Sequence, residues 1–444
     1  MLSADARGTI KETYIRERRR LPMKRVLTAL ILMTTLAFAL ILSGCGKDEP
    51  QGGGRVEPSA NGAVITPAPT PDATPTPAPD PYDAVRNYWS EDQLTQAWGP
   101  TQVVEHIFFH PVIAYPEWAF KDCPSPQREK DQLDDWMVTV DEFNKIIQSI
   151  YDKGYILVAM EDVWSEVTDE SGTHMVRNTL MLPEGKKPLI ISFDDVNYYR
   201  YMLEEGFTSK LVLGEDGQIW AECTDPYTGE TFLTQELDAT PILDNFVLEH
   251  PDFSLNGAKA IYSLTGYQGI LGYRTQTDRD VTDPAELAAF EANRQKEIEA
   301  VKPIIERLKE TGWTFGCHTW AHIRLGSVSL TRIQDDIPRW LDEVGSLVGP
   351  TNIIFYPYGD RPDGNDWTKT GEAFRYIQSM GFRVFASVGI ESFSFIKKDI
   401  SAVICDRLHP DGTTLRWSRE RYLKFYDAME IMDTENRPDL GRDW

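Results

Sequence analysis

The sequence has few cysteines, and no two of them are closely spaced. Five occur among 444 residues: Cys45, Cys123, Cys223, Cys317 and Cys405. None belongs to a CxxC motif, so a zinc cluster built on thiolates is not expected. The last four allow one or two disulfides in an exported chain, but buried free thiols explain them at least as well.

Basic residues are scarce once the amino-terminal region is set aside. The formal net charge is −24, yet residues 1–44 carry a net charge of +5, so the rest of the chain carries −29. Binding to nucleic acid requires a basic surface that neutralises phosphates. The composition therefore argues against a nucleic-acid partner, whereas neutral or cationic polymers are compatible with it. The length, with 41% hydrophobic residues, permits one large domain or two.

The amino-terminal region has the pattern of an export signal. A basic Lys24-Arg25 pair precedes an apolar run over residues 26–42, and Leu42-Ser-Gly-Cys45 follows. This ending resembles a bacterial lipobox, which implies cleavage before Cys45 and acylation of its thiol. The alternative is a plain membrane-spanning anchor, because 17 residues is near the lower limit for crossing a bilayer. Either reading predicts an exported protein that is held at the extracellular face of the membrane.

Composition divides the chain into three parts. Residues 1–45 form the signal peptide with its lipobox, and translation is expected to start at Met23, where such a signal usually begins. Residues 46–81 form a linker with eight prolines between Pro58 and Pro81, which cannot bury a core and favours an extended polyproline II conformation. Residues 82–444 are expected to form the folded domain, with an insertion at about 207–250.

Strands and helices are expected to alternate through this domain. Short apolar runs predict strands over residues 103–109, 155–158, 189–193, 258–264, 313–317, 352–355, 383–387 and 402–405. Helical spacing predicts helices over 140–153, 284–309, 330–347, 372–380 and 417–432. Turn signals at 215–217 and 225–229 indicate that the insertion is rich in hairpins. This alternation predicts an α/β fold with a parallel sheet, either a barrel or a doubly wound sheet.

Four polar clusters directly follow predicted strands. They are Asp194-Asp195, the pair His318 and His322, Tyr356-Pro-Tyr-Gly359, and Leu408-His409. Taken alone, two adjacent aspartates are more often a turn or a helix cap. Because the carboxyl ends of parallel strands lie on one side of a sheet, we expect all four clusters to meet there.

Two of these clusters have the composition of a catalytic metal site. His318 and His322 are four residues apart, so on a helical turn they would project the same way. With a carboxylate from the Asp194-Asp195 pair they give three ligands and leave a position open for water, as in catalytic zinc sites. Such a metal makes water more acidic and polarises a carbonyl oxygen. The second aspartate can then take the proton of the attacking water, and His409 can protonate the leaving amine.

The ordered motifs resemble those of the polysaccharide deacetylases, the NodB-homology family of carbohydrate esterases. The similarity covers roughly residues 103–410, and its opening segment, with Phe109-His-Pro-Val-Ile113, is similar to the branch that acts on poly-N-acetylglucosamine. The resemblance implies a distorted (β/α)7 barrel, a divalent metal that is commonly zinc, and removal of acetyl groups from N-acetylglucosamine-containing polysaccharide such as peptidoglycan. By position, the resemblance implies that Asp194 is the base and His409 the acid. It also implies that Asp195, His318 and His322 are the metal ligands, and that the backbone at Pro357-Tyr358 binds the oxyanion.

The motifs depart from the family pattern in two places. Many members have an arginine in the third motif that hydrogen-bonds the base, but this stretch reads Phe355-Tyr-Pro-Tyr358. The family's downstream Asp and Trp have no clear counterpart, because Asp363-Gly-Asn-Asp-Trp367 follows the third motif too closely and is interpreted as a turn. Arg361 and Arg407 are candidate substitutes for the arginine.

Other residues near the motifs have two interpretations each. His110 lines the site or is structural, and Cys317 is expected to be a buried strand residue. Aromatic side chains that would stack on sugars, or simply pack, are Trp320, Tyr358 and Trp367.

Two other functions compete with that of a metal-dependent deacetylase. The missing arginine and the long insertion suggest a catalytically weak or inactive glycan-binding lipoprotein on the same scaffold. The lipobox alone suggests a solute-binding lipoprotein of a transporter, which the metal-binding pattern disfavours.

Overall fold

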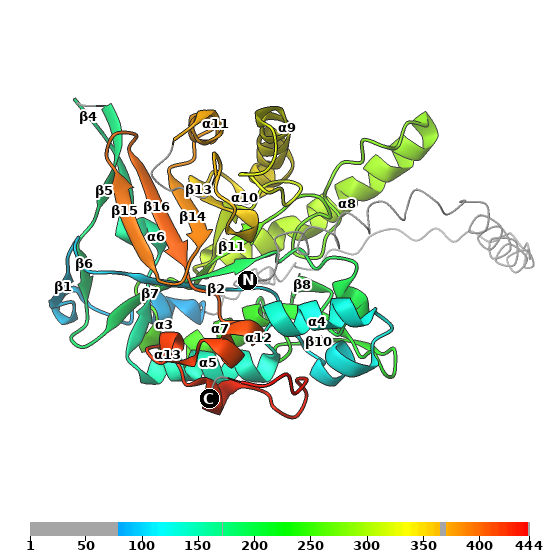
Figure 1. Ribbon diagram of the computed structural model, residues 1–444, viewed down its shortest axis with the longest axis horizontal. Helices are drawn as coiled ribbons and strands as arrows, with labels where there is room; N and C mark the ends of the chain where they lie inside the picture. Colours follow the sequence, from blue (N-terminus) through cyan, green and yellow to red (C-terminus); the bar gives the residue numbers. More distant parts are fainter. Residues whose placement is uncertain (1–78, 171, 365–369, 443–444) are drawn as a thin grey trace, which may run out of the picture. The chain divides into compact units, whose positions relative to one another are not determined.

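The computed structural model describes residues 79–170, 172–364 and 370–442, and its main feature is one nine-stranded sheet (Figure 1). Eight of its strands run parallel to their neighbours, and β15 (Phe393–Lys397) runs antiparallel to β16. The parallel strands are β2 (Glu105–Phe109), β3 (Tyr155–Leu157), β7 (Lys187–Asp194), β11 (Ala260–Leu264), β12 (Thr314–Cys317), β13 (Ile353–Phe355), β14 (Val384–Val388) and β16 (Ala402–Arg407).

The two ends of this sheet meet, so the sheet curls into a nearly closed barrel. The Phe108 N–H donates to the Leu408 carbonyl at 2.9 Å, and the Leu408 N–H donates to the His106 carbonyl at 3.0 Å. These bonds join β2 to the residue after β16, while β15 takes the neighbouring place along β16 itself. Closure is therefore limited to a short stretch, which makes the barrel distorted. The predicted fold class is confirmed.

Helices connect the successive strands. Crossovers run through α5 (Val140–Asp152), α7 (Ala239–Glu249), α8 (Pro284–Glu310), α9 (Leu330–Trp340) and α11 (Glu372–Ser379). The predicted capping box of α5 is present, since Thr139 Oγ1 accepts the Glu142 N–H and the Glu142 carboxylate accepts the Thr139 N–H. Helix α8 begins at the predicted Asp283 cap, contains Pro303 and projects beyond its neighbours (Figure 1). Other helices are α3 (Tyr82–Arg86), α4 (Gln127–Trp136), α6 (Met160–Val163) and α10 (Ser346–Val348).

Three small antiparallel sheets accompany the barrel. Residues 207–250 contain β8 (Lys210–Leu213), β9 (Ile219–Thr224) and β10 (Thr231–Thr234), and then α7. The other two sheets pair β1 (Gln96–Trp98) with β6 (Leu180–Leu182), and β4 (Trp164–Asp169) with β5 (Gly172–Arg177). The predicted hairpins are thus found in the first half of the 207–250 segment, whereas its second half is helical.

The core follows the two-residue period of the strands. Along β7, Leu189 and Ile191 belong to the larger cluster of buried apolar side chains, whereas Ile190 belongs to a second cluster. On β16 the second cluster contains Val403 and Cys405. This alternation continues to the ends of the strands, where polar residues replace apolar ones on the inner face.

The expectation of one helix over residues 417–432 is wrong. The structure has three short helices there, α12 (Gly412–Trp417), α13 (Arg419–Tyr422) and α14 (Ala428–Ile431). Ser418 has φ −141° and ends α12, and the Asp427 carboxylate caps α14 while it pairs with Arg419. Local capping therefore overrides the helical spacing of apolar residues.

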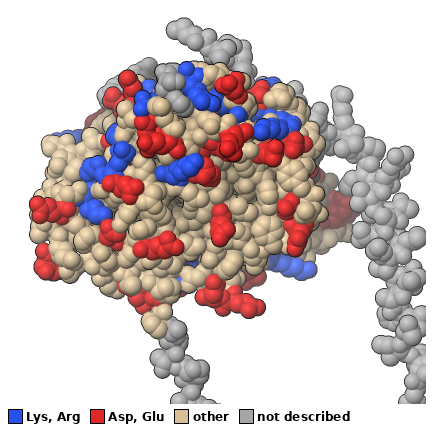
Figure 2. Space-filling model, turned by 90° about the horizontal axis from the view of Figure 1, so that it is seen from below, with Lys and Arg blue, Asp and Glu red and all other residues tan. Residues whose placement is uncertain are grey.

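The predicted signal peptide, the lipobox with Cys45, the start at Met23 and nearly all of the linker lie outside the described residues. Within the part that is described, none of the helices has the length and apolar character needed to span a bilayer. Cys123, Cys223, Cys317 and Cys405 are buried free thiols, so no disulfide joins these four. Figure 2 shows acidic and basic side chains interspersed on the face seen from below.

Candidate active site

The polar clusters named from the sequence lie at the carboxyl ends of parallel strands. Asp194 is the last residue of β7, and Asp195 follows it. His318 follows β12, Tyr356 follows β13, and His409 comes two residues after β16. His110, at the end of β2, joins the same rim. The expectation that these clusters meet at one end of a parallel sheet therefore agrees with the structure.

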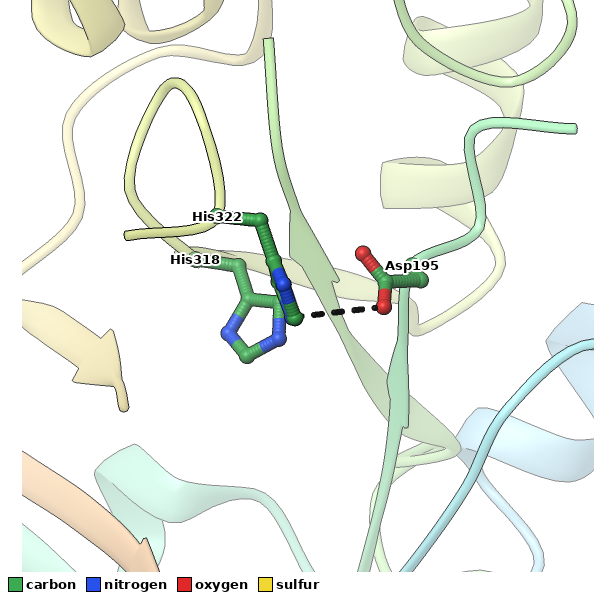
Figure 3. A group of neighbouring side chains, drawn as sticks. All are labelled: Asp195, His318 and His322. Atoms are coloured by element: carbon green, nitrogen blue, oxygen red, sulfur yellow. Dashed lines mark ion pairs between the residues drawn. The ribbon is translucent and has the colours of Figure 1, made fainter. Parts of the chain in front are cut away.

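Three of these residues form a group that could hold one metal ion (Figure 3). One candidate ligand atom from each of Asp195, His318 and His322 lies within 4.8 Å of the others, and all three residues are buried. The His322 Nε2 is 3.5 Å from Asp195 Oδ2. The His318 Nδ1 lies 3.0 Å from the Phe355 carbonyl, so it donates its proton there and leaves Nε2 for a ligand. Two imidazoles and one carboxylate are a donor set that fits Zn²⁺.

The histidine pair does not lie on a helical turn, contrary to expectation. Residues 318–322 form an irregular loop in which Thr319 has φ 59° and His322 has φ 51°. The Thr319 side-chain oxygen accepts the Ile323 N–H at 3.0 Å. Local side-chain bonding and two left-handed residues, rather than helical periodicity, bring the two rings to a centroid separation of 4.8 Å.

Four of the nine non-glycine residues with positive φ in the described part of the chain lie at this rim. Asp195 has φ 63° and Tyr358 has φ 60°, in addition to the two residues of the histidine loop. Left-handed conformations are unfavourable for residues other than glycine, and such strain collects where function requires a fixed geometry. The loop conformations are therefore consistent with a functional site.

Arg407 holds the second carboxylate, that of Asp194. Its guanidinium donates to both oxygens of Asp194, at 2.8 and 2.9 Å, and one of its nitrogens also donates to the Ser192 hydroxyl at 3.0 Å. Burial alone would raise the pKa of Asp194, but the charge of Arg407, followed by that of His318, outweighs burial and holds this pKa below its usual range. Asp194 is thus ionised, as a general base must be, and its Oδ2 lies 3.8 Å from His318 Nε2.

Arg361, the other arginine considered as a substitute, is engaged elsewhere. Its guanidinium donates to both carboxylate oxygens of Asp406. The inner face of β16, which carries Val403 and Cys405, also carries Arg407. The adjacent Asp406, which is the partner of Arg361, lies on the other face of the strand, so only Arg407 reaches Asp194.

His409 lies between a carboxylate and a second histidine. Its Nδ1 is 2.9 Å from Asp411 Oδ2, and its Nε2 is 3.0 Å from His110 Nδ1. Burial, and after it the charge of His409, lowers the pKa of His110 to about 4. His110 is therefore neutral near pH 7 and can accept a hydrogen bond from a protonated His409.

Phe108 contacts both His409 and Arg407, the partner of Asp194. Its ring stacks on the His409 imidazole at 4.2 Å with an interplanar angle of 13°. The Arg407 guanidinium lies 4.0 Å from the centroid of the same ring. The spacing between the partner of Asp194 and the imidazole of His409 is therefore set by one aromatic side chain.

The other residues named from the sequence divide into rim and core. The Tyr358 ring packs edge-on against His322 at 4.4 Å and is 43% exposed, and the adjoining Pro357 is buried. Trp320 packs under Arg339 and donates its indole N–H to Glu343, which indicates a structural role. Trp367 lies outside the described residues. Cys317 is buried on β12, as expected.

The sequence did not single out Asp411 or Asp336. Asp411 also caps α12, where it accepts the Thr414 N–H at 2.7 Å; its position two residues after His409 was the only available signal. Asp336, on α9, accepts the Trp320 and Ala321 N–H groups at 2.5 and 3.0 Å, which holds the histidine loop. No sequence pattern marked this long-range contact.

The fold and the site together define a class of α/β-barrel hydrolase. A carboxylate with two imidazoles lies beside an ion-paired carboxylate and a carboxylate-oriented histidine, as metal-assisted attack by water requires. Residues 285–383 match the family model described as polysaccharide deacetylase. This segment is therefore similar to a polysaccharide deacetylase domain, which confirms the resemblance seen in the sequence. The matched segment includes His318, His322 and Tyr358, whereas Asp194, Asp195 and His409 lie outside it.

Several solved structures resemble this one remotely. The Streptococcus pyogenes deacetylase PplD, in complex with acetate, has 16% identity and a TM-score of 0.39, covering 73% of this chain and 97% of that one. IcaB from Ammonifex degensii has 13% identity and a TM-score of 0.35, covering 70% and 93%. BC0361, a polysaccharide deacetylase from Bacillus cereus, has 11% identity and a TM-score of 0.35, covering 69% and 65%. No match was found among curated proteins.

Proposed function

We propose that this protein is a metal-dependent hydrolase that removes N-acetyl groups from N-acetylglucosamine-containing polysaccharide at the cell surface. The substrate class is peptidoglycan or poly-N-acetylglucosamine, and a lipid on Cys45 holds the enzyme at the membrane. The observation that carries the proposal is the Asp194–Arg407 ion pair beside the group of Asp195, His318 and His322. This arrangement provides a separate base next to a complete set of metal ligands.

Each residue of the site has a role in amide hydrolysis. Asp195, His318 and His322 would hold the divalent ion, which supplies a Lewis acid that polarises the amide carbonyl and makes water more acidic. Asp194 takes the proton of the attacking water, because Arg407 keeps it ionised.

The proposed acid is His409, which stacks on Phe108. His409 gives its Nε2 proton, which His110 Nδ1 accepts before substrate binds, to the leaving amine, and Asp411 holds the His409 ring through Nδ1. The backbone N–H of Tyr358, next to Pro357, is assigned to the oxyanion.

The alternative of an inactive glycan-binding protein loses its main support. It rested on the absence of the family arginine from Phe355-Tyr-Pro-Tyr358. Arg407, from a different strand, forms a bidentate hydrogen-bonded ion pair with Asp194. The base is therefore held without that arginine.

Acetate release tests the proposal directly. The purified protein is incubated with N-acetylglucosamine oligomers, peptidoglycan and poly-N-acetylglucosamine, with and without a chelator. Acetate release is expected from at least one polymer, with loss on chelation and recovery on adding Zn²⁺. Asp194→Asn is expected to lower kcat by at least about 10²-fold and to retain its metal. Acetate release that is indifferent to both treatments would refute the mechanism.

A further inference from the structure

Tyr199 contacts the Asp195 carboxylate of the proposed metal site on the oxygen that does not face the imidazoles. Its hydroxyl donates to Asp195 Oδ1, whereas the other oxygen of that carboxylate, Oδ2, faces His322 at 3.5 Å. Both Tyr199 and Asp195 are buried. The two oxygens of Asp195 therefore have different surroundings, one directed to a phenol and one to the imidazoles.

The direction of the hydrogen bonds follows from the groups involved. An ionised carboxylate only accepts, so the single proton of the Tyr199 hydroxyl goes to Asp195. Thr265 Oγ1 lies 2.5 Å from the same phenolic oxygen. Because the phenol proton is already used, the Thr265 hydroxyl donates to Tyr199. The result is a chain of donors that runs from Thr265 through Tyr199 to Asp195.

This chain is built on a rigid support. Asn197 ties the loop after β7 to the segment after β11, since its side-chain amide donates to the Thr265 carbonyl at 2.8 Å and its side-chain oxygen accepts the Thr265 N–H at 3.3 Å. The Tyr199 ring stacks between Tyr267 at 4.9 Å and Tyr201 at 5.8 Å. The phenol is therefore held by the rings of Tyr267 and Tyr201 and by the Thr265 hydroxyl.

We propose that Tyr199 is a positioning residue that holds Asp195 so that only Oδ2 is offered to a divalent cation, with Thr265 fixing the phenol. A buried hydroxyl needs a hydrogen-bond partner, and Thr265 alone would satisfy Tyr199. The additional bond to Asp195, whose own backbone is held at φ 63°, is what a metal ligand requires, because ligating carboxylates depend on their outer hydrogen bonds for orientation. This inference rests on the proposed metal site and concerns its affinity rather than the reaction.

The test measures metal binding by the full chain, independently of catalysis. The protein is stripped of metal, and its Zn²⁺ dissociation constant is determined by competition with a chromophoric chelator. Tyr199→Phe is expected to weaken Zn²⁺ binding by about 10- to 100-fold. The matched control is Tyr201→Phe, which removes a hydroxyl from the same ring stack without touching Asp195 and is expected to bind Zn²⁺ as the wild type does. Equal affinities of the two variants would overturn the proposal.

Two further measurements separate this proposal from other failures. Thermal midpoints of the metal-free proteins show whether Tyr199→Phe still folds; if it does not, Thr265→Val is expected to weaken Zn²⁺ binding by a smaller factor, and unchanged affinity there overturns the proposal. If the wild type binds Zn²⁺ but releases no acetate, the proposed function fails and the role of Tyr199 stands. If the wild type binds no Zn²⁺, both fail.

Discussion

Arg407 is the side chain on which the assignment of a base depends most. It is fully buried, packs against the rings of Phe108 and Phe355 at 4.0 and 4.5 Å, and donates to Asp194 through two nitrogens. A buried carboxylate without such a partner would hold a proton, since burial disfavours its charge. The basicity of Asp194 near neutral pH is therefore set by one residue on another strand.

Arg407→Lys is expected to move the acidic limb of the kcat/KM profile to higher pH. Lysine is a point donor and cannot bond both oxygens of Asp194 and the Ser192 hydroxyl at once. The effect of burial then gains weight, so the pKa of Asp194 rises and the base becomes protonated at a higher pH. The profile is measured as acetate release at saturating Zn²⁺.

The control for this experiment is Arg361→Lys. Arg361 pairs with Asp406 rather than Asp194, so its replacement should leave the acidic limb where it is. If both variants shift the limb equally, or neither does, Arg407 does not set the pKa of the base.

Asp411→Asn is expected to lower kcat by about tenfold or more while leaving metal content unchanged. The carboxylate holds His409 Nδ1 at 2.9 Å and would stabilise the imidazolium that gives its proton to the amine. Asparagine can still cap α12 through its side-chain oxygen, so the helix should persist. Unchanged kcat with unchanged Zn²⁺ would show that Asp411 does not assist His409 as the acid.

The sequence identified the main site residues because each lies at or shortly after the end of a predicted strand. Asp194, Asp195 and His318 lie directly at such an end, and His322 and His409 follow within five residues. The partners of these residues were harder to find. Choosing Arg407 over Arg361 required knowing that Arg407 lies on the inward face of β16. Asp336 reaches the histidine loop from a helix, 14 residues after His322.

The loop that carries His318 and His322 is held by a side chain of helix α9. Its Trp320 and Ala321 N–H groups both bond to the Asp336 carboxylate. Burial is the main cause that raises the pKa of Asp336, to about 6, although these two N–H groups act in the opposite direction. The geometry of the two imidazoles thus depends on a carboxylate that touches neither of them.

Asp336→Ala is expected to destabilise the protein by about 1–3 kcal/mol, because it leaves the N–H groups of the half-buried Trp320 and Ala321 without their acceptor. It should also weaken Zn²⁺ binding. Both are measured, by urea unfolding and by chelator competition. The neighbouring Asp335 pairs with Arg279 and Arg332 at the surface, so Asp335→Ala should cost less than about 1 kcal/mol. Equal costs would contradict the role given to Asp336.

Among the elements, those with strong local signals were predicted best. The capping box predicted the start of α5 and the Asp283-Pro284 pair predicted the start of α8. The antiparallel β15 and the division of residues 412–431 into three helices were missed. Their positions depend on pairing with β16 and on caps such as Asp427, which are tertiary contacts that periodicity does not report.

The stability of the whole molecule is expected to depend on pH through Glu205. This residue is 2% exposed and accepts a hydrogen bond from Ser125 at 2.6 Å, and burial raises its pKa to about 7. A folded-state pKa above the ordinary value means that its contribution to stability is present below about pH 4.5 and is lost as the pH rises through about 7.

Glu205→Gln stays neutral and keeps an acceptor for Ser125. The free energy of unfolding of the wild type, relative to this variant, should therefore fall by about 2–3 kcal/mol between pH 5 and pH 9. Urea unfolding at both pH values measures the change. A difference between the two proteins that does not vary with pH would show that Glu205 ionises normally.

The proposed function requires that segments distant in the sequence converge to bind one divalent ion beside a separate base. Its most direct test is the Zn²⁺ stoichiometry of the purified full chain, compared with Asp195→Ala, His318→Ala, His322→Ala and Asp194→Asn. One tightly bound Zn²⁺ per chain is expected in the wild type and in Asp194→Asn, and its loss is expected in the other three. Stoichiometric Zn²⁺ in any of those three, or none in the wild type, would contradict it.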